Sequence, residues 1–375
     1  MPGNTNGSSY LYSLDGLRGV AALSIVFLHY SSYLFSDIGS FVESFTPMLN
    51  RTYLFVDMFF ILSGFVLSLR YSETFNTTVM SRPYFSFMSK RFFRVYPLHL
   101  ATLMFLFILH RWLLPFYPDI PPDEFQVRRG NFSLFSNVLL IHSSGIGDRG
   151  CFDCTSWNYP SWSISVEWLS YFSIPSLIFI LTRLKRLVPV LLLGLMIGLL
   201  FIESKVGHLD VASTPGWYRC LVGMIIGVCL NIYAYKRFAI SRTIVILWAI
   251  LMLLGFHYLK NDTLLVVGIS IYLLLVVNCS KQGILSSSYF QWLGKRSFSI
   301  YLMHVPVQDL TSFFIRLQFN VSPQNLSAFV QVLGFMAAVC ATLFLSNFSY
   351  RWIELPFIKG VPIKSRDSLK LAVKR

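Results

Sequence analysis

The sequence predicts an all-α, polytopic integral membrane protein with about ten transmembrane helices. Of its 375 residues, 55% are hydrophobic and 13% are charged, whereas a soluble domain carries about 25% charged residues. The mean hydropathy is +0.60. The net charge of +14 is spread over short connections between apolar runs. It therefore indicates membrane orientation rather than a nucleic-acid partner.

Ten apolar runs are long enough to cross the hydrocarbon core as helices. They lie at residues 14–34, 52–70, 93–114, 161–181, 187–203, 216–235, 242–259, 263–280, 297–317 and 327–353. A further apolar stretch, 132–142, is too short to cross and is expected to be re-entrant or interfacial. We expect no cleavable signal peptide, because the N-terminal residues lack a basic region.

The basic residues predict that both termini are cytoplasmic. If successive spans cross the membrane in alternating directions, about two thirds of the 31 Lys and Arg residues fall in loops on one side. Loops rich in Lys and Arg mark the cytoplasmic face. Residues 1–358 are expected to form one membrane domain and 359–375 a basic cytoplasmic tail. The longest external segment, 115–160, is expected to be a folded cap. Its Cys151 and Cys154 suit a disulfide better than a zinc site, because no further ligand pair completes one.

The first span carries two candidate functional residues, Arg18 and His29. In a helix they lie on nearly the same face, roughly 16 Å apart. An ionisable side chain inside the hydrocarbon is costly and by default indicates a functional site. The alternative for His29 is a structural histidine bonded to a neighbouring helix. The ninth span carries a second such residue, His304, whereas five other histidines are expected to be structural or loop residues: His99, His110, His142, His208 and His257.

The connection before the third span contains two arginines three residues apart, Arg91 and Arg94. They share a helix face, and guanidinium groups bind phosphate oxygens bidentately. Together with Arg18 they could hold an anionic cytosolic ligand, such as the phosphates of a nucleotide or coenzyme A. The alternative is that they anchor the helix to anionic lipid.

The fourth span combines a carboxylate, Glu167, with polar residues at its start. Ser161, Ser165 and Trp168 lie on one helical surface and could hydrogen-bond a polyol. The alternative is an interfacial tryptophan with one snorkelling acid.

Three further positions have simpler interpretations. Ser63 and Gly64 in the second span are expected to form a helix-packing site. Asp57 in the same span has no assigned role. Glu354, after the last span, is expected to pair with a cytoplasmic arginine.

Six motifs, in this order along the whole chain, resemble those of acyltransferase family 3, a family of membrane O-acyltransferases. They are LDGLRGVAALSIVFLH at 14–29, VDMFFILSGFVLS at 56–68, KRFFRVYPLH at 90–99, SWSISVEW at 161–168, SFSIYLMH at 297–304 and YRWIELP at 350–356.

The resemblance implies a ten-span bacterial inner-membrane enzyme, surrounded by lipid, that needs no metal. It would move an acyl group, usually acetyl, from cytosolic acyl-coenzyme A to a hydroxyl of a surface or lipid-linked carbohydrate. Some members carry an appended soluble domain; here we expect the membrane domain to act alone or with a partner.

The resemblance also assigns roles to residues. Arg18 and His29 match a pair tied to catalysis, and Arg91 and Arg94 match a pair tied to the donor. His29 is then the expected general base, Glu167 would orient the acceptor or support the imidazole, and His304 would be a second acid/base group or a transient acyl carrier.

Two other classes remain open. A polytopic secondary transporter would also have ten spans and midplane ionisable groups. The membrane-bound O-acyltransferase superfamily performs similar chemistry on a different set of helices, and it is disfavoured because the matching motifs belong to family 3.

Overall fold

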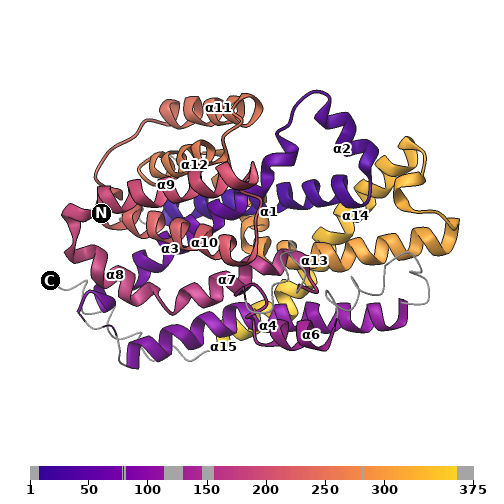
Figure 1. Cartoon of the computed structure of the whole chain (residues 1–375), viewed down its shortest axis with the longest axis horizontal. Coiled ribbons are helices and arrows are strands. Elements are labelled where there is room, and N and C mark those ends of the chain that lie inside the picture. Colours follow the sequence, from indigo (N-terminus) through magenta and orange to yellow (C-terminus); the bar gives the residue numbers. More distant parts are fainter. Residues whose placement is uncertain are drawn as a thin grey trace, which may run out of the picture.

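The computed structural model of the chain describes residues 8–77, 79, 82–113, 130–145, 156–279 and 283–360. Over these residues the chain is a bundle of helices without a β-strand, which confirms the all-α class. Most of the long helices run roughly along the longest axis of the molecule (Figure 1). Helices α11 and α12 lie at one edge of the bundle in this view, and α4, α6 and α15 lie at the opposite edge.

Every predicted apolar run falls on a helix or on a pair of consecutive helices. The helices are α1 (Ser8–Tyr33), α2 (Ser36–Glu43), α3 (Phe55–Phe75), α4 (Arg82–Leu113), α6 (Asn131–Val138), α7 (Trp162–Tyr171), α8 (Ile174–Arg183), α9 (Val188–Val206), α10 (Ser213–Cys229), α11 (Arg242–Tyr258), α12 (Asp262–Val277), α13 (Ser288–Phe319), α14 (Ala328–Ser349) and α15 (Leu355–Gly360).

Length and hydropathy identify membrane-capable helices among the described residues. Five are long and apolar enough to cross: 49–75, 82–112, 185–206, 214–234 and 328–360. Two bent pairs, α1 with α2 and α7 with α8, raise the number to seven if each pair is one span. Helices α11 and α12 are apolar but shorter, at 17 and 16 residues. The chain is therefore a multi-pass membrane protein, and five to seven of the ten predicted spans meet this test.

The predicted fourth span differs from a straight crossing helix. It consists of α7 and α8, which meet at an angle of 59°. Pro175 lies at the start of α8, where its missing N–H and its ring prevent the preceding helix from continuing. The bend directs α7 and α8 along different lines through the bundle.

Close approach of α1 and α13 forms the centre of the molecule. These two helices share the most extensive contact between elements. A Cβ added at Gly19 would overlap Leu293, and one added at Gly294 would overlap the carbonyl of Asp15. Small residues let helix backbones approach closely in membranes, so the sequence joins its first and ninth predicted spans at these glycines.

Helices α3 and α10 form the second extensive contact. Gly64 lies directly on the backbone of Met224, which confirms it as a helix-packing position. A buried ion pair also joins the two helices, because Arg219 Nη2 donates to Asp57 Oδ2 over 2.6 Å and both side chains are at most 3% exposed. The structure thus assigns Asp57 to an internal ion pair, and removing one partner of such a pair is strongly destabilising.

Candidate active site

The two intramembrane histidines form one pair. His29 Nδ1 of α1 is 2.8 Å from His304 Nε2 of α13, and the rings stack with centroids 5.0 Å apart. His304 is fully buried, whereas His29 keeps some exposure. Residues 275 positions apart in the sequence therefore meet in a hydrogen bond at the contact between α1 and α13.

Neighbouring polar groups fix the pair in place. The Tyr30 hydroxyl donates to the backbone carbonyl of His304 over 3.0 Å. Asn158 Nδ2 donates to the carbonyl of Leu302 over 2.9 Å. The ring of Tyr159 contacts His29 edge-on, with centroids 4.8 Å apart. These contacts hold both rings from α1, from α13 and from the segment that leads into α7.

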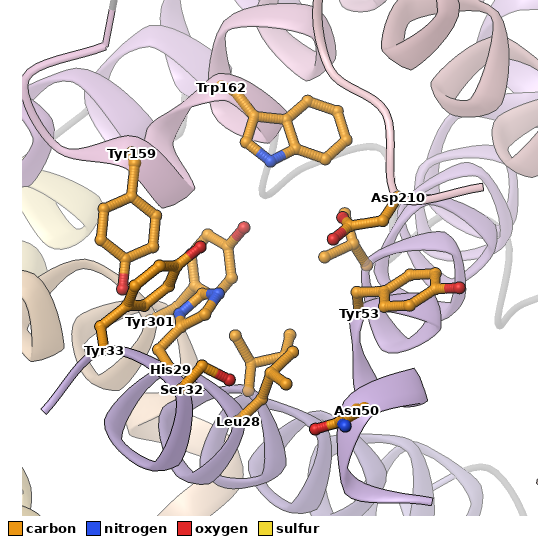
Figure 2. Close-up of a pocket in the computed structure, with 12 residues that line it drawn as sticks. Leu28, His29, Ser32, Tyr33, Asn50, Tyr53, Tyr159, Trp162, Asp210 and Tyr301 are labelled. Atoms are coloured by element: carbon orange, nitrogen blue, oxygen red, sulfur yellow. The ribbon is translucent and has the colours of Figure 1, made fainter. Parts of the chain in front are cut away.

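His29 faces a cavity of about 260 Å³. Figure 2 shows Tyr159 and Tyr33 beside His29, and Trp162 and Asp210 farther round the cavity. Asn50 and Tyr53 complete the lining from the segment that precedes α3. The sequence pattern did not indicate these lining residues, because the connection that carries Asp210 reaches the cavity only through the packing of α9 and α10.

Asp210 is the acidic group of this cavity. It lies in the connection between α9 and α10, outside both of these membrane-capable helices. Burial raises the pKa of the Asp210 carboxyl, and the nearby Arg219 guanidinium acts in the opposite direction. The cavity therefore offers the imidazole of His29, which is hydrogen-bonded to His304, and a carboxyl group, two kinds of side chain used in general acid–base catalysis.

The three predicted arginines lie together near the start of the first predicted span, on the N-terminal side of His29 along α1. We call this region the arginine end of α1. Arg18 pairs with Asp15 over 3.3 Å and interacts electrostatically with Arg94. Arg94 Nη1 and Glu354 Oε1 form a salt bridge at 2.6 Å, which confirms the predicted pairing of Glu354 with an arginine. Arg91 carries a buried Nε that has no hydrogen-bond partner among the described residues.

Glu167 lies with the arginines. Its carboxylate accepts a hydrogen bond from the Tyr171 hydroxyl over 2.7 Å and interacts electrostatically with Arg18. It does not line the cavity at His29. The structure thus separates Glu167 from the histidine pair, because α7 carries it away from Tyr159 and Trp162 and toward the arginine end of α1.

The polar surface predicted at the start of the fourth span faces protein rather than the cavity. Ser165 Oγ donates to the carbonyl of Leu140 over 2.9 Å, and Ser161 Oγ is 3.1 Å from His142 Nε2. Trp168 packs against Phe92. It is Trp162, on another face of α7, that lines the cavity.

The remaining histidines of α4 and its neighbours have structural contacts. His99 and His142 stack with ring centroids 5.7 Å apart, and His110 Nε2 is 2.7 Å from Asp309 Oδ2. Burial, followed by the charge of His99, lowers the pKa of His142 to about 3. A neutral, enclosed imidazole fits the structural role expected for His142.

A metal site must be considered separately for the pair Cys151 and Cys154 and for the rest of the chain. These two residues, and with them the expected disulfide, lie outside the described residues. Among the residues that the structure does describe, no group of three or more His, Cys, Asp and Glu side chains is placed to hold a metal ion.

Comparison with known proteins identifies relatives along almost the whole chain. The O-acetyltransferase OatA of Staphylococcus aureus is 25% identical over 93% of this chain and 57% of its own length. The peptidoglycan O-acetyltransferase OatA of Listeria monocytogenes is 25% identical over 94% of this chain and 56% of its own length. Protein 2 in the picA locus of Rhizobium radiobacter is 39% identical over 24% of this chain and 40% of its own length. The chain therefore spans little more than half the length of the two acetyltransferases.

A family model connects the chain to one group of proteins. No solved structure matches this chain significantly. The model that describes an acyltransferase domain, that of acyltransferase family 3, matches residues 11–347. This range includes the histidine pair, the cavity and the three arginines. The chain belongs to acyltransferase family 3.

Proposed function

We propose that this protein is a membrane O-acyltransferase that moves an acyl group, acetyl above all, from cytosolic acyl-coenzyme A to a hydroxyl of a surface or lipid-linked carbohydrate. The observation that carries the proposal is the His29–His304 hydrogen bond at the wall of a cavity in a chain of this family. The names of the two acetyltransferase relatives support an acetyl group and a glycan acceptor.

In this proposal His29 is the general base. His304 occupies Nδ1 of His29, so Nε2 is the nitrogen available to a ligand in the cavity. Nε2 takes the proton of the acceptor hydroxyl while the hydroxyl oxygen attacks the thioester carbonyl carbon. The carbon–sulfur bond breaks, and the leaving coenzyme A thiolate takes the proton from the imidazolium. The products are an ester and free coenzyme A, and a positioned base contributes about 10²–10⁴-fold to such a step.

His304 acts as the group that positions His29 and stabilises its charged form. In this proposal the imidazole proton of His304 lies on Nδ1. Nε2 of His304 then accepts a hydrogen bond from Nδ1–H of His29. Full burial of His304 favours this acid–base role over that of an acyl carrier, because a carrier must reach two substrates.

The arginine end of α1 is the proposed site for the coenzyme A phosphates. Arg18, Arg91 and Arg94 would supply the positive charge, and the free Nε of Arg91 has a donor to offer. Glu167 would orient Arg18 and Tyr171 there. The acyl-bearing arm of the donor would extend along α1 toward His29, over the roughly 16 Å that eleven helical residues span.

The membrane arrangement follows from the charge distribution. We propose that the ten predicted runs all cross the membrane, that both termini are cytoplasmic and that the protein lies in the bacterial inner membrane. The arginine end of α1 is then cytoplasmic and His29 is nearer the external side. The described residues of the segment 115–160, which include α6, would cover this external end, and the rest of the predicted cap lies outside the described residues.

The test is replacement of His29 by alanine, with His257→Ala as the matched control. His257 is a histidine of α11 that contacts Thr46 and does not line the cavity. We expect His29→Ala to lower ester-linked acetate on surface glycan, and coenzyme A release by the purified protein, by about 10²-fold or more. Equal membrane amounts of the three proteins are required. Retained acetylation in His29→Ala would refute the catalytic assignment, and a transporter would release no coenzyme A at all.

A further inference from the structure

The wall of the cavity that faces His29 contains polar groups that the proposed chemistry leaves unused. Asp210 and Trp162 line this wall, and Tyr53 lies next to Asp210 (Figure 2). The Asp210 carboxylate forms no hydrogen bond with a described residue. The indole nitrogen of Trp162 points into the cavity (Figure 2). The wall thus presents one strong acceptor and one donor toward the space in front of His29.

The connection that carries Asp210 is fixed on both sides of that residue. Before it, the Leu209 backbone N–H donates to Asp262 Oδ2 over 2.7 Å. After it, the Val211 carbonyl accepts from Arg219 Nη1 over 2.9 Å, and Arg219 is itself held by Asp57. Because the backbone on both sides of Asp210 is already held, little freedom is lost when a ligand binds there, which favours affinity.

Two buried carboxylates in this region, Asp262 and Glu203, are both engaged in hydrogen bonds to neighbouring protein groups. Asp262 also accepts a hydrogen bond from Tyr53 over 2.5 Å. Glu203 accepts from the backbone N–H groups of Asp262 and Thr263 over 2.7 and 3.0 Å. Asp210 differs from both, because its carboxylate is directed at the cavity and has no such backbone partner. Its placement is therefore that of a binding residue.

Volume and charge restrict the ligand. A cavity of about 260 Å³ lies below the roughly 300–1,000 Å³ of sites that enclose drug-sized ligands, so it suits one sugar ring rather than an oligosaccharide. Asp210 is the acidic residue of the lining and no lysine or arginine accompanies it there. Arg219, which packs over the ring of Trp162, is already paired with Asp57. A negatively charged sugar would therefore meet the like charge of Asp210 in a region of low dielectric constant.

We infer that the wall formed by Asp210 and Trp162 is the acceptor subsite, and that it selects an uncharged pyranose over an anionic one. The inference rests on the proposed function, because it takes the ligand of this cavity to be the acceptor. The Asp210 carboxylate accepts hydrogen bonds from sugar hydroxyls, and the Trp162 indole donates one. The sugar is thereby held with a hydroxyl in front of His29.

Direct binding of small glycosides to the purified full chain tests this inference without any transfer step. The probes are methyl N-acetylglucosaminide, which is neutral, and methyl glucuronide, which is anionic, with Kd measured by saturation-transfer NMR titration. We expect the wild-type protein to bind the neutral probe more tightly. Asp210→Asn should raise its Kd about tenfold, the typical effect of losing a hydrogen bond to a charged group. The control Asp37→Asn changes an exposed acid of α2 and should leave Kd unchanged.

A second variant keeps the test decisive if Asp210→Asn is poorly folded. Asp210→Lys should invert the preference toward the glucuronide, a result that a misfolded protein cannot give. Equal affinity of the wild type for both probes, no binding of either, or an unchanged Kd in Asp210→Asn would overturn the inference. These outcomes are independent of the His29→Ala assay, whose failure would instead refute the proposed acyl transfer.

Discussion

The two ends of α1 carry functional candidates of opposite character. At one end, His29 and His304 bond to each other, and His304 is fully buried. At the other end, the side chains of Arg18 and Arg94 are 26% and 36% exposed and are paired with carboxylates. The arginine end is therefore rich in partly exposed positive charge, as our proposed donor site requires, whereas no lysine or arginine lines the cavity at the histidine end. One helix thus joins two environments that suit two different substrates.

The largest expected effect separates the ends by their kinetic signatures. His304→Ala should lower kcat about 10²-fold, because His29 loses the partner that fixes its orientation and tautomer. The KM for acetyl-coenzyme A should stay unchanged, since the arginine end is intact. Steady-state kinetics with the purified protein measure both constants. Partial recovery of kcat in His304→Gln, which retains a hydrogen-bonding side chain, would support positioning; an altered donor KM alone would contradict it.

The reciprocal experiment changes the arginine end. Arg91→Ala should raise the KM for acetyl-coenzyme A about tenfold, as expected for the loss of a charge-assisted hydrogen bond to phosphate, and should leave kcat nearly unchanged. Arg82→Ala, at the exposed start of α4, is the matched control. An effect of Arg91→Ala on acceptor affinity, with donor affinity preserved, would remove the proposed division between the two ends.

Glu167 provides a sharper test of where that division lies. Its contacts with Tyr171 and Arg18 predict that Glu167→Gln raises donor KM several-fold without changing acceptor binding. The sequence-based hypothesis, in which Glu167 orients the acceptor, predicts the reverse. Donor and acceptor titrations on the same preparation distinguish the two, with Glu43→Gln on the exposed end of α2 as control.

The smallest expected effect is a pH dependence at the cavity wall. Burial raises the pKa of Asp210, so the ionised acceptor for sugar hydroxyls is lost as pH falls through a value above that of an ordinary aspartate. Acceptor kcat/KM of the wild type should then approach that of Asp210→Asn at low pH. Because both proteins contain His29, the ratio of their kcat/KM values at each pH cancels the contribution of His29 titration. A ratio that does not change with pH would exclude a role for Asp210 ionisation.

The sequence predicted the helical class, and it singled out candidate site residues in α1, α4 and α13, because those signals are local. A charged or imidazole side chain inside an apolar run is visible without knowing its neighbours, as at Arg18, His29 and His304. The pairing of the two histidines needed the contact between α1 and α13, which depends on Gly19 and Gly294 together.

Local sequence signals could not predict two other features, the positions of Glu167 and Asp210. The place of Glu167 depends on the direction of α7, which the bend before α8 sets. The proposed role of Asp210 depends on Asp262 of α12 and Arg219 of α10, which fix the connection on both sides of Asp210. In both cases the decisive contact is tertiary, and hydrophobic periodicity does not encode it.

The 275-residue separation of the two histidines has a consequence for the synthesis of the protein. Chains emerge from the ribosome at roughly 5–20 residues per second, so α13 follows α1 into the membrane after about 14–55 s at that rate. During this interval His29 has no imidazole partner and the cavity lacks one of its walls. A half-made chain therefore lacks the histidine pair to which we assign the acyl transfer, until α13 has been synthesised.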